Sequence, residues 1–167
     1  MKRRVLAVVA ACTLSLSAPG VFAASADPAL SRQVSAFIDA WHDDAAHARM
    51  AYFDKIAADG VYIGTDKTEL WGKAAFETWA KPYFDKKSAW AFKAVSRNVY
   101  TSGDGKIVWF DELLDTQMGP CQASGVLRKT ANGFEIEHYQ LSMAVPNELG
   151  KSVTDLITAH ANKAAAK

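Results

Sequence analysis

The spacing of apolar residues near the start of the chain predicts a long helix. Seven apolar residues recur every three or four positions and so fall on one side of a helix: Leu30, Val34, Phe37, Ile38, Trp41, Ala45 and Ala48. Asp27-Pro28 is a suitable start, because Asp accepts bonds from the free N–H groups of the first turn and Pro fits the first helical position. We expect this helix over about Pro28–His47.

A second short helix and a hairpin follow. Tyr52, Phe53 and Ile56 share a helical spacing that Asp59-Gly60 closes. After them, residues 61–63 are β-type, residues 64–68 are turn-like, and residues 69–71 continue as strand. This pattern predicts a short hairpin.

Gly72 precedes a third helix. Its apolar face consists of Phe76, Trp79, Ala80, Tyr83 and Phe84. Pro82 has no N–H to donate, so we expect the helix to end or bend near Lys81.

From residue 88 onwards the apolar period becomes that of strands. Four long strands are expected, over residues 90–100, 106–117, 121–130 and 134–143. Asn132-Gly133 predicts a tight hairpin turn between the last two, because both residues accept positive φ. Pro146 ends the sheet, and Val153, Leu156, Ile157 and His160 lie on one face of a terminal helix.

Helices followed by a run of antiparallel strands are typical of an α+β fold. Long meandering strands curl because strands twist. The early helices must then cover the concave face of the sheet. A half-barrel of this kind leaves a conical cavity wherever the helices do not fill it.

Composition and charge exclude several classes of function. The chain has 167 residues, which suits one domain. Its net charge is +1, but Asp and Glu outnumber Lys and Arg once Lys2, Arg3 and Arg4 are set aside. Nucleic-acid binders need a concentrated basic surface. We therefore expect no nucleic-acid partner.

The first 26 residues resemble a secretory signal. A basic start precedes an apolar stretch over Val5–Ser17, Pro19-Gly20 breaks it, and small residues allow cleavage after Ala23 or Ala26. The stretch is shorter than the roughly 20 residues that span a membrane. We therefore expect a periplasmic or secreted protein that is free of the membrane after cleavage. The expected organisation is a signal peptide over 1–26, a domain over 27–147 and a C-terminal helix or tail over 148–167.

Cys121 stands alone once Cys12 has left with the signal. No Lys, Arg or His lies beside Cys121 to lower the pKa of its thiol. The sequence therefore favours a buried apolar role for it.

Several short stretches between about Leu30 and Leu149 form a recognisable set. They are Trp41-His42, Tyr52-Phe53, residues 61–66 with Glu69 and Trp71, residues 82–84, residues 109–112, residues 124–127 and residues 146–148. Together they resemble a branch of small SnoaL-like bacterial proteins within the nuclear-transport-factor-2-like (NTF2-like) superfamily. The branch often has Arg-Gly where Gln122-Ala123 stands here, so the charge of that Arg is missing. The resemblance implies a cone, in which a curved antiparallel sheet wraps around N-terminal helices, often dimeric through the open sheet. It implies no particular reaction.

Two carboxylates lie on the predicted hairpin, near the expected mouth of the cavity. If Asp66 and Glu69 differ in burial, one of them would act as the general acid and the other as the general base. Alternatively, Asp66 caps the turn and Glu69 faces water.

A second acidic pair lies inside a predicted strand. Neighbouring side chains of a strand point to opposite faces, so one of Asp111 and Glu112 faces the cavity. Apolar neighbours would raise the pKa of that carboxyl, as a general base requires. Alternatively, the acid lies on the outer face and pairs with Arg97 or Arg128.

His138 is the candidate for proton transfer, because histidine titrates near neutral pH. It follows Phe134 and Ile136 at a period of two, so all three should share a face, with Gln140 and Ser142 further along. Apolar walls with a few polar groups are typical of a ligand pocket. The alternative is a hydrogen-bonded core histidine. Tyr139 belongs to the face opposite to that of His138, so we expect it to face outwards and to serve an interface.

The candidate site residues fall into two sets. The catalytic candidates are His138, Asp111, Glu112 and Asp66, and the ligand-binding candidates are His42, Tyr62, Thr65, Glu69, Trp71, Trp109 and Gln140. His42 lies at the edge of the first helical stripe and would look into the cone. The spacing of His42, Asp43 and His47 fits no metal motif, so we expect neither a metal nor a cofactor.

Three functions remain open at this point. The first is a pocket that binds a small, mainly apolar or aromatic molecule without turning it over. The second is a cofactor-free lyase or isomerase that uses His138 with a pocket carboxylate. The third is an interaction module of the cell envelope that dimerises through the sheet, with Tyr139, Leu141 and Met143 on the outer face.

Overall fold

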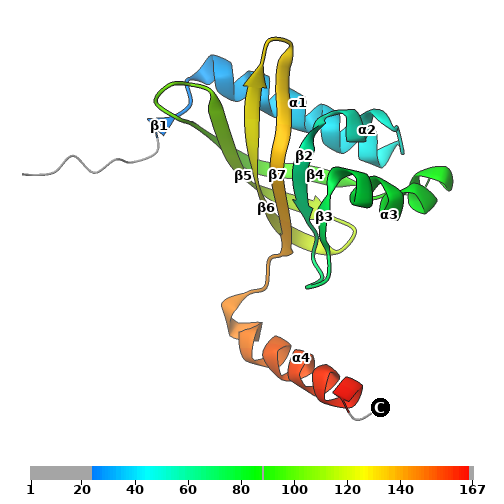
Figure 1. Ribbon diagram of the computed structural model, residues 1–167. Coiled ribbons are helices and arrows are strands. Elements are labelled where there is room, and N and C mark those ends of the chain that lie inside the picture. The colour runs from blue at the N-terminus through cyan, green and yellow to red at the C-terminus, as the bar shows by residue number, and fades with distance from the viewer. Residues whose placement is uncertain (1–23, 88, 166–167) are drawn as a thin grey trace, which may run out of the picture.

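The computed structural model describes residues 24–87 and 89–165, and it has the α+β architecture that the pattern predicts (Figure 1). The helices are α1 (Pro28–Ala46), α2 (Ala51–Asp54), α3 (Lys73–Asp85), a 3₁₀ turn (Asn147–Leu149) and α4 (Gly150–Ala165). The strands are β1 (Ala24–Ser25), β2 (Ile56–Ile63), β3 (Leu70–Gly72), β4 (Phe92–Thr101), β5 (Ile107–Thr116), β6 (Gly119–Thr130) and β7 (Gly133–Met143). The helices α1, α2 and α3 gather on one side of a curved sheet that does not close (Figure 1).

The strands form one sheet over the described part of the chain, in the order β1-β4-β5-β6-β7-β2-β3. The four long strands β4 to β7 form the expected antiparallel meander. Strand β2 joins the far edge by pairing in parallel with β7. This pairing places the β2–β3 hairpin beside the last strand of the meander, although the paired residues Val61 and His138 are 77 positions apart in the chain.

The residues of the expected signal lie almost wholly outside the described ones. Ala24 and Ser25 pair with Thr101 and Tyr100 as β1, and the Ala26 N–H donates to the Val99 carbonyl at 2.9 Å. A cut after Ala23 would keep this strand, whereas a cut after Ala26 would remove it. Export itself stays a prediction.

Helix α1 begins as the sequence predicts. Asp27 Oδ1 accepts the N–H groups of Ala29 and Leu30 at 2.8 and 2.9 Å, and these two bonds lower the pKa of Asp27. The buried side of the helix packs on β4 and carries Val34, Ile38, Trp41, His42, Asp44 and Ala45.

Two helix ends differ from the prediction. Helix α2 stops at Asp54, because the chain enters β2 already at Ile56. Helix α3 does not end near Lys81 but continues through Pro82 to Asp85. Pro82 lies in the last turn, where one missing N–H bond costs little against the burial of Phe84 and the Lys81–Asp85 ion pair.

A β-bulge in β7 reverses the expected facing of its second half. Ile136 pairs with Leu127, but His138 pairs with Val126, so Glu137 is an additional residue on β7. The prediction that His138 shares the face of Ile136 is therefore wrong, and His138, Gln140 and Ser142 lie on the outer face. Tyr139 and Leu141, expected outside, are buried inside the cone.

The interior of the cone is largely filled by aromatic rings. Its largest fully buried side chains include Trp41, Tyr52, Phe53, Phe76, Phe110 and Tyr139. The Trp41 and Tyr52 rings stack with centroids 4.7 Å apart, and Trp41 Nε1 donates to the Tyr52 carbonyl at 3.1 Å. In the part of the chain that the structure describes, the expected conical hollow is therefore reduced to a small pocket. This pocket lies between the β2–β3 hairpin, α3 and the β5–β6 loop.

Helix α4 stands away from the cone (Figure 1). Its apolar residues Leu156 and Ile157 are 71% and 64% exposed. No helix in residues 24–87 and 89–165 combines the length and apolar character that crossing a membrane requires.

Gly125 allows β6 to pass under a buried ring. A Cβ on Gly125 would lie 2.6 Å from the Phe110 ring, which is fully buried and has no room to move. We expect Gly125→Ala to lower the free energy of unfolding by about 1–3 kcal/mol, because an additional methyl overpacks the core. Urea denaturation measures this change.

Gly103→Ala is the matched control for Gly125→Ala. Nothing lies within 4 Å of a Cβ at Gly103, so its free energy of unfolding should stay within about 0.5 kcal/mol of wild type. Equal stability of the two variants would contradict the close packing of Phe110 on Gly125.

Candidate functional site

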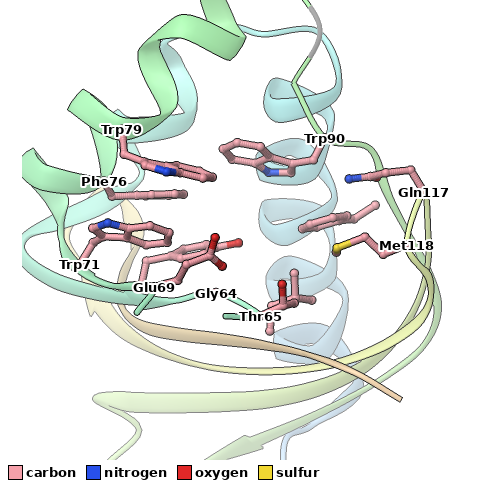
Figure 2. A pocket seen from close by; sticks show the side chains of 12 residues that line it. Gly64, Thr65, Glu69, Trp71, Phe76, Trp79, Trp90, Gln117 and Met118 are labelled. Atoms are coloured by element: carbon pink, nitrogen blue, oxygen red, sulfur yellow. The ribbon is translucent and has the colours of Figure 1, made fainter. Parts of the chain in front are cut away.

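The space that the aromatic core leaves open is a pocket of about 140 Å³. It lies between the β2–β3 hairpin, α3 and the β5–β6 loop (Figure 2). The lining residues are Tyr62, Gly64, Thr65, Glu69, Trp71, Phe76, Trp79, Trp90, Phe92, Gln117, Met118 and Leu141. The lining is mostly aromatic and apolar, with a few polar groups among the rings, as ligand pockets usually are.

Three rings of the pocket wall stack on one another. The Trp71 and Trp79 centroids lie 4.6 Å apart, and those of Trp71 and Phe76 lie 5.4 Å apart. Phe76 and Trp79 belong to the apolar stripe of α3, and Trp71 comes from β3, which runs directly into that helix. The Trp90 ring adjoins this stack, with its centroid 5.8 Å from that of Phe76 and 6.1 Å from that of Trp79 (Figure 2).

Glu69 supplies a carboxylate to the pocket. Its Oε2 accepts the Asp66 N–H at 3.1 Å, which holds the side chain against the hairpin. Gly64 makes this position possible, since a Cβ on Gly64 would lie 2.2 Å from Oε2. Among the described residues, Glu69 forms no ion pair.

Asp66 is not part of the pocket but caps the hairpin turn. Its Oδ1 accepts bonds from the Thr68 hydroxyl and N–H at 2.6 and 2.8 Å, and these bonds lower the pKa of Asp66. The side chain is exposed. Of the two open interpretations of this pair, the structure thus gives Asp66 the turn and Glu69 the pocket.

Tyr62 contributes a neutral hydroxyl beside Glu69. Burial raises the pKa of Tyr62 strongly, and the nearby charge of Glu69 raises it further. The tyrosine therefore stays protonated, and Glu69 is the charged side chain of the pocket lining.

Glu112, not Asp111, faces the interior, and it ties α1 to three strands. Its Oε1 accepts bonds from His42 Nε2 at 2.8 Å and from the Tyr139 hydroxyl at 3.1 Å. Its Oε2 accepts two bonds from Arg97, at 2.9 and 2.7 Å. Arg97 also donates to the Ser35 carbonyl and pairs with Asp39 on α1.

The surroundings of Glu112 keep it ionised. Burial by itself raises the pKa of Glu112, but the hydrogen bonds and charges of His42 and Arg97 outweigh that effect, and the pKa is lowered. The prediction that the inward carboxyl has a raised pKa is therefore wrong. The predicted Arg97 partner is present, but the pair lies inside the cone.

His42 is buried and does not line the aromatic pocket, although its ring lies 5.6 Å from that of Phe92, which does. With Nε2 donating to Glu112, Nδ1 has no hydrogen-bond partner among the described residues. His42 instead borders an open groove between α1 and β4.

Four other candidates lie on the outer face of the sheet. Asp111 accepts bonds from Asn98 Nδ2 at 2.8 Å and from the Tyr100 hydroxyl at 2.9 Å. Trp109 stacks on the Tyr100 ring at 5.9 Å. His138 and Gln140 share this face because of the bulge in β7.

The structure therefore brings together four of the seven predicted ligand-binding residues: Tyr62, Thr65, Glu69 and Trp71. Their binding of a ligand stays a prediction. The sequence reasoning missed Phe92, Gln117 and Met118 as pocket residues. They come from the first residue of β4 and from the β5–β6 loop, which only the tertiary structure brings to the pocket.

No three His, Cys, Asp or Glu side chains in the described part of the chain are placed to hold a metal ion together. Cys121 is a fully buried free thiol. Its Sγ lies 3.6 Å from the Thr116 hydroxyl.

Comparison with known proteins gives a family and a fold. The family described as the SnoaL-like domain matches residues 34–146, more than half of the chain. The comparison with curated proteins gives no match.

Several solved structures share the fold. An NTF2-like protein of unknown function from Pseudomonas putida KT2440 is 15% identical, with a TM-score of 0.57, and the match covers 75% of this chain and 93% of that one. The association domain of C. elegans CaMKII is 15% identical, with a TM-score of 0.58 and coverage of 69% and 96%. A structure from Catenulispora acidiphila in complex with S-DNPA is 16% identical, with a TM-score of 0.56 and coverage of 70% and 94%.

The Glu112 network leads to a prediction on stability. In Glu112→Gln the donors of His42 and Arg97 remain buried and lose the carboxylate. We therefore expect the free energy of unfolding at pH 7 to fall by about 3–5 kcal/mol.

Because the pKa of Glu112 is lowered on folding from its ordinary value of 4.5, the carboxylate stabilises the fold above that pH. Its contribution is lost as the pH falls further, so the gap between wild type and variant should narrow in acid.

Urea denaturation at neutral and acidic pH measures this gap. Glu135→Gln is the control, because the Glu135–Arg128 pair joins neighbouring strands but is exposed. Its loss should cost at most about 1 kcal/mol. A gap for Glu112→Gln that stays constant into acid would contradict the role of its ionised form.

Proposed function

The chain belongs to the SnoaL-like domain family, and we propose that it binds a small, mainly apolar molecule in the pocket beside Glu69. The observation that carries this proposal is an aromatic wall with a single carboxylate, left open at one end of an otherwise filled cone. Rings that served only the core would close over one another. Trp79 instead remains 38% exposed at the rim.

The size of the pocket limits the ligand. A dry cavity of about 150 Å³ holds one benzene molecule. The pocket here measures about 140 Å³, which favours one ring with a short substituent over a fused polycyclic compound. The complex of the similar Catenulispora acidiphila fold with S-DNPA supports a ligand-binding role.

Binding is favoured over the lyase or isomerase alternative. That alternative requires His138 and a carboxylate within hydrogen-bond reach. Glu69 and Glu112 lie on the inner side of the sheet, and His138 lies on the outer side. Asp111 shares the face of His138, but its two oxygens are bonded to Asn98 and Tyr100.

Single-ring compounds test the pocket. We expect benzyl alcohol or phenol to raise the melting temperature of the protein, because a ligand that binds only the folded state stabilises it. At 100 times its dissociation constant the gain is about 2.7 kcal/mol. Thr65→Trp should abolish the shift, since Thr65 is exposed at the pocket and an indole there would fill it.

Thr78→Trp is the control for Thr65→Trp. Thr78 is exposed on α3 but does not line the pocket, so this variant should keep the shift. No stabilisation of the wild-type protein by any single-ring compound would overturn the proposal.

A homodimer through the outer sheet face is a second proposal. Helices α1, α2 and α3 cover the inner face, and no helix of the described residues covers the outer face within one copy (Figure 1). The residues that would form this interface differ, however, from those that the sequence predicts. Tyr139 and Leu141 are buried inside, while Trp109, Leu113 and Val126 lie half-buried on the outer face.

Light scattering tests this dimer. We expect the mass of two chains for the wild-type protein and of one chain for Trp109→Glu, because a charge in the middle of the shared face is not tolerated there. Thr78→Glu, which adds the same charge on α3, should stay dimeric. A wild-type protein with the mass of one chain would refute the dimer.

A further inference from the structure

The charge of the pocket narrows the class of ligand. We infer that the pocket selects an organic cation, a protonated amine on a single-ring or similarly small apolar group. This inference rests on the proposed binding function and goes beyond it, because a pocket for neutral molecules does not need the features described next.

The first feature is an uncompensated negative charge. Glu69 is the charged member of the pocket lining, and no Lys or Arg of residues 24–87 and 89–165 belongs to that lining. Lys67 lies on the same hairpin but is exposed, and it forms no ion pair with Glu69 among the described contacts. A carboxylate in partly apolar surroundings attracts a cation more strongly than it would in water.

The second feature is the unused hydrogen-bonding capacity of this carboxylate. Oε2 accepts one backbone N–H, from Asp66, and no described residue donates to Oε1. Figure 2 shows the carboxylate between the indole of Trp71 and the side chain of Thr65. A bound ammonium group would donate to it there, and charge-assisted bonds of this kind are roughly twice as strong as neutral ones.

The third feature is the aromatic wall itself. Trp71, Trp79 and Trp90 contribute three indoles to one small pocket. The face of an indole attracts a cation within about 6 Å of the ring centre, and tryptophan is the best of the aromatic residues for this purpose. A carboxylate and several indoles around one space thus favour the same sign of charge.

The same features disfavour an anion. The lining offers it no basic group, and the approach of a ligand carboxylate to Glu69 would be repulsive. A neutral alcohol would donate one bond to Glu69 but would gain nothing from the charge. The predicted order of affinity is therefore cation, neutral molecule, anion.

Three compounds with one ring each test this order: benzylammonium, benzyl alcohol and benzoate. Calorimetric titration at neutral pH should give a dissociation constant at least about tenfold lower for benzylammonium than for benzyl alcohol. Benzoate should bind more weakly than both.

Glu69→Gln isolates the charge, because glutamine keeps the shape of the side chain. The variant should lose the preference for benzylammonium over benzyl alcohol. Measurable binding of benzyl alcohol, whose hydroxyl donates to the amide oxygen in place of the carboxylate, shows that the pocket is intact. Glu77→Gln is the matched control, since Glu77 lies on α3 outside the pocket lining, and it should keep the full preference.

The outcomes separate the inference from the proposal beneath it. Equal affinity of wild-type protein for benzylammonium and benzyl alcohol, or a preference that survives in Glu69→Gln, would overturn the cation inference and leave the binding function standing. Absence of binding by all three compounds would overturn both.

Discussion

The architecture depends on one buried carboxylate. Glu112 accepts four hydrogen bonds from three side chains, which lie on α1, β4 and β7, while Glu112 itself belongs to β5. Such a group is costly to bury unless all its acceptor positions are used, and here they are. It therefore fixes how α1 lies in the cone, and with it the position of Trp41, the neighbour of His42.

The position of Trp41 determines what remains of the hollow. Trp41 contacts the rings of Tyr52, Tyr62 and Tyr139, so one side of the cone is filled by its own aromatic side chains. The hairpin and α3 add a further ring cluster on the other side of Tyr62. What is left open is a pocket large enough for one ring, and the carboxylate of Glu69 in its lining is the feature from which we infer a preference for cations.

Two local features decided which candidate residues meet. The parallel pairing of β2 with β7 brings Glu69 and Trp71 to the edge of the cone beside Leu141. The bulge at Glu137 moves His138 to the outer face and Tyr139 to the inner one. Because side chains alternate along a strand, one additional residue reverses every facing beyond it.

The sequence by itself determined the order of the elements, the meander, the start of α1 and the hairpin that carries Glu69. These features depend on apolar periodicity, capping and turn residues, which act between neighbours in the chain. Only the tertiary structure decided that Glu112 rather than Asp111 faces inwards, that His138 faces outwards and that the cone is mostly filled. Each of these depends on strand register and on the volumes of side chains from distant segments, and a local pattern specifies neither.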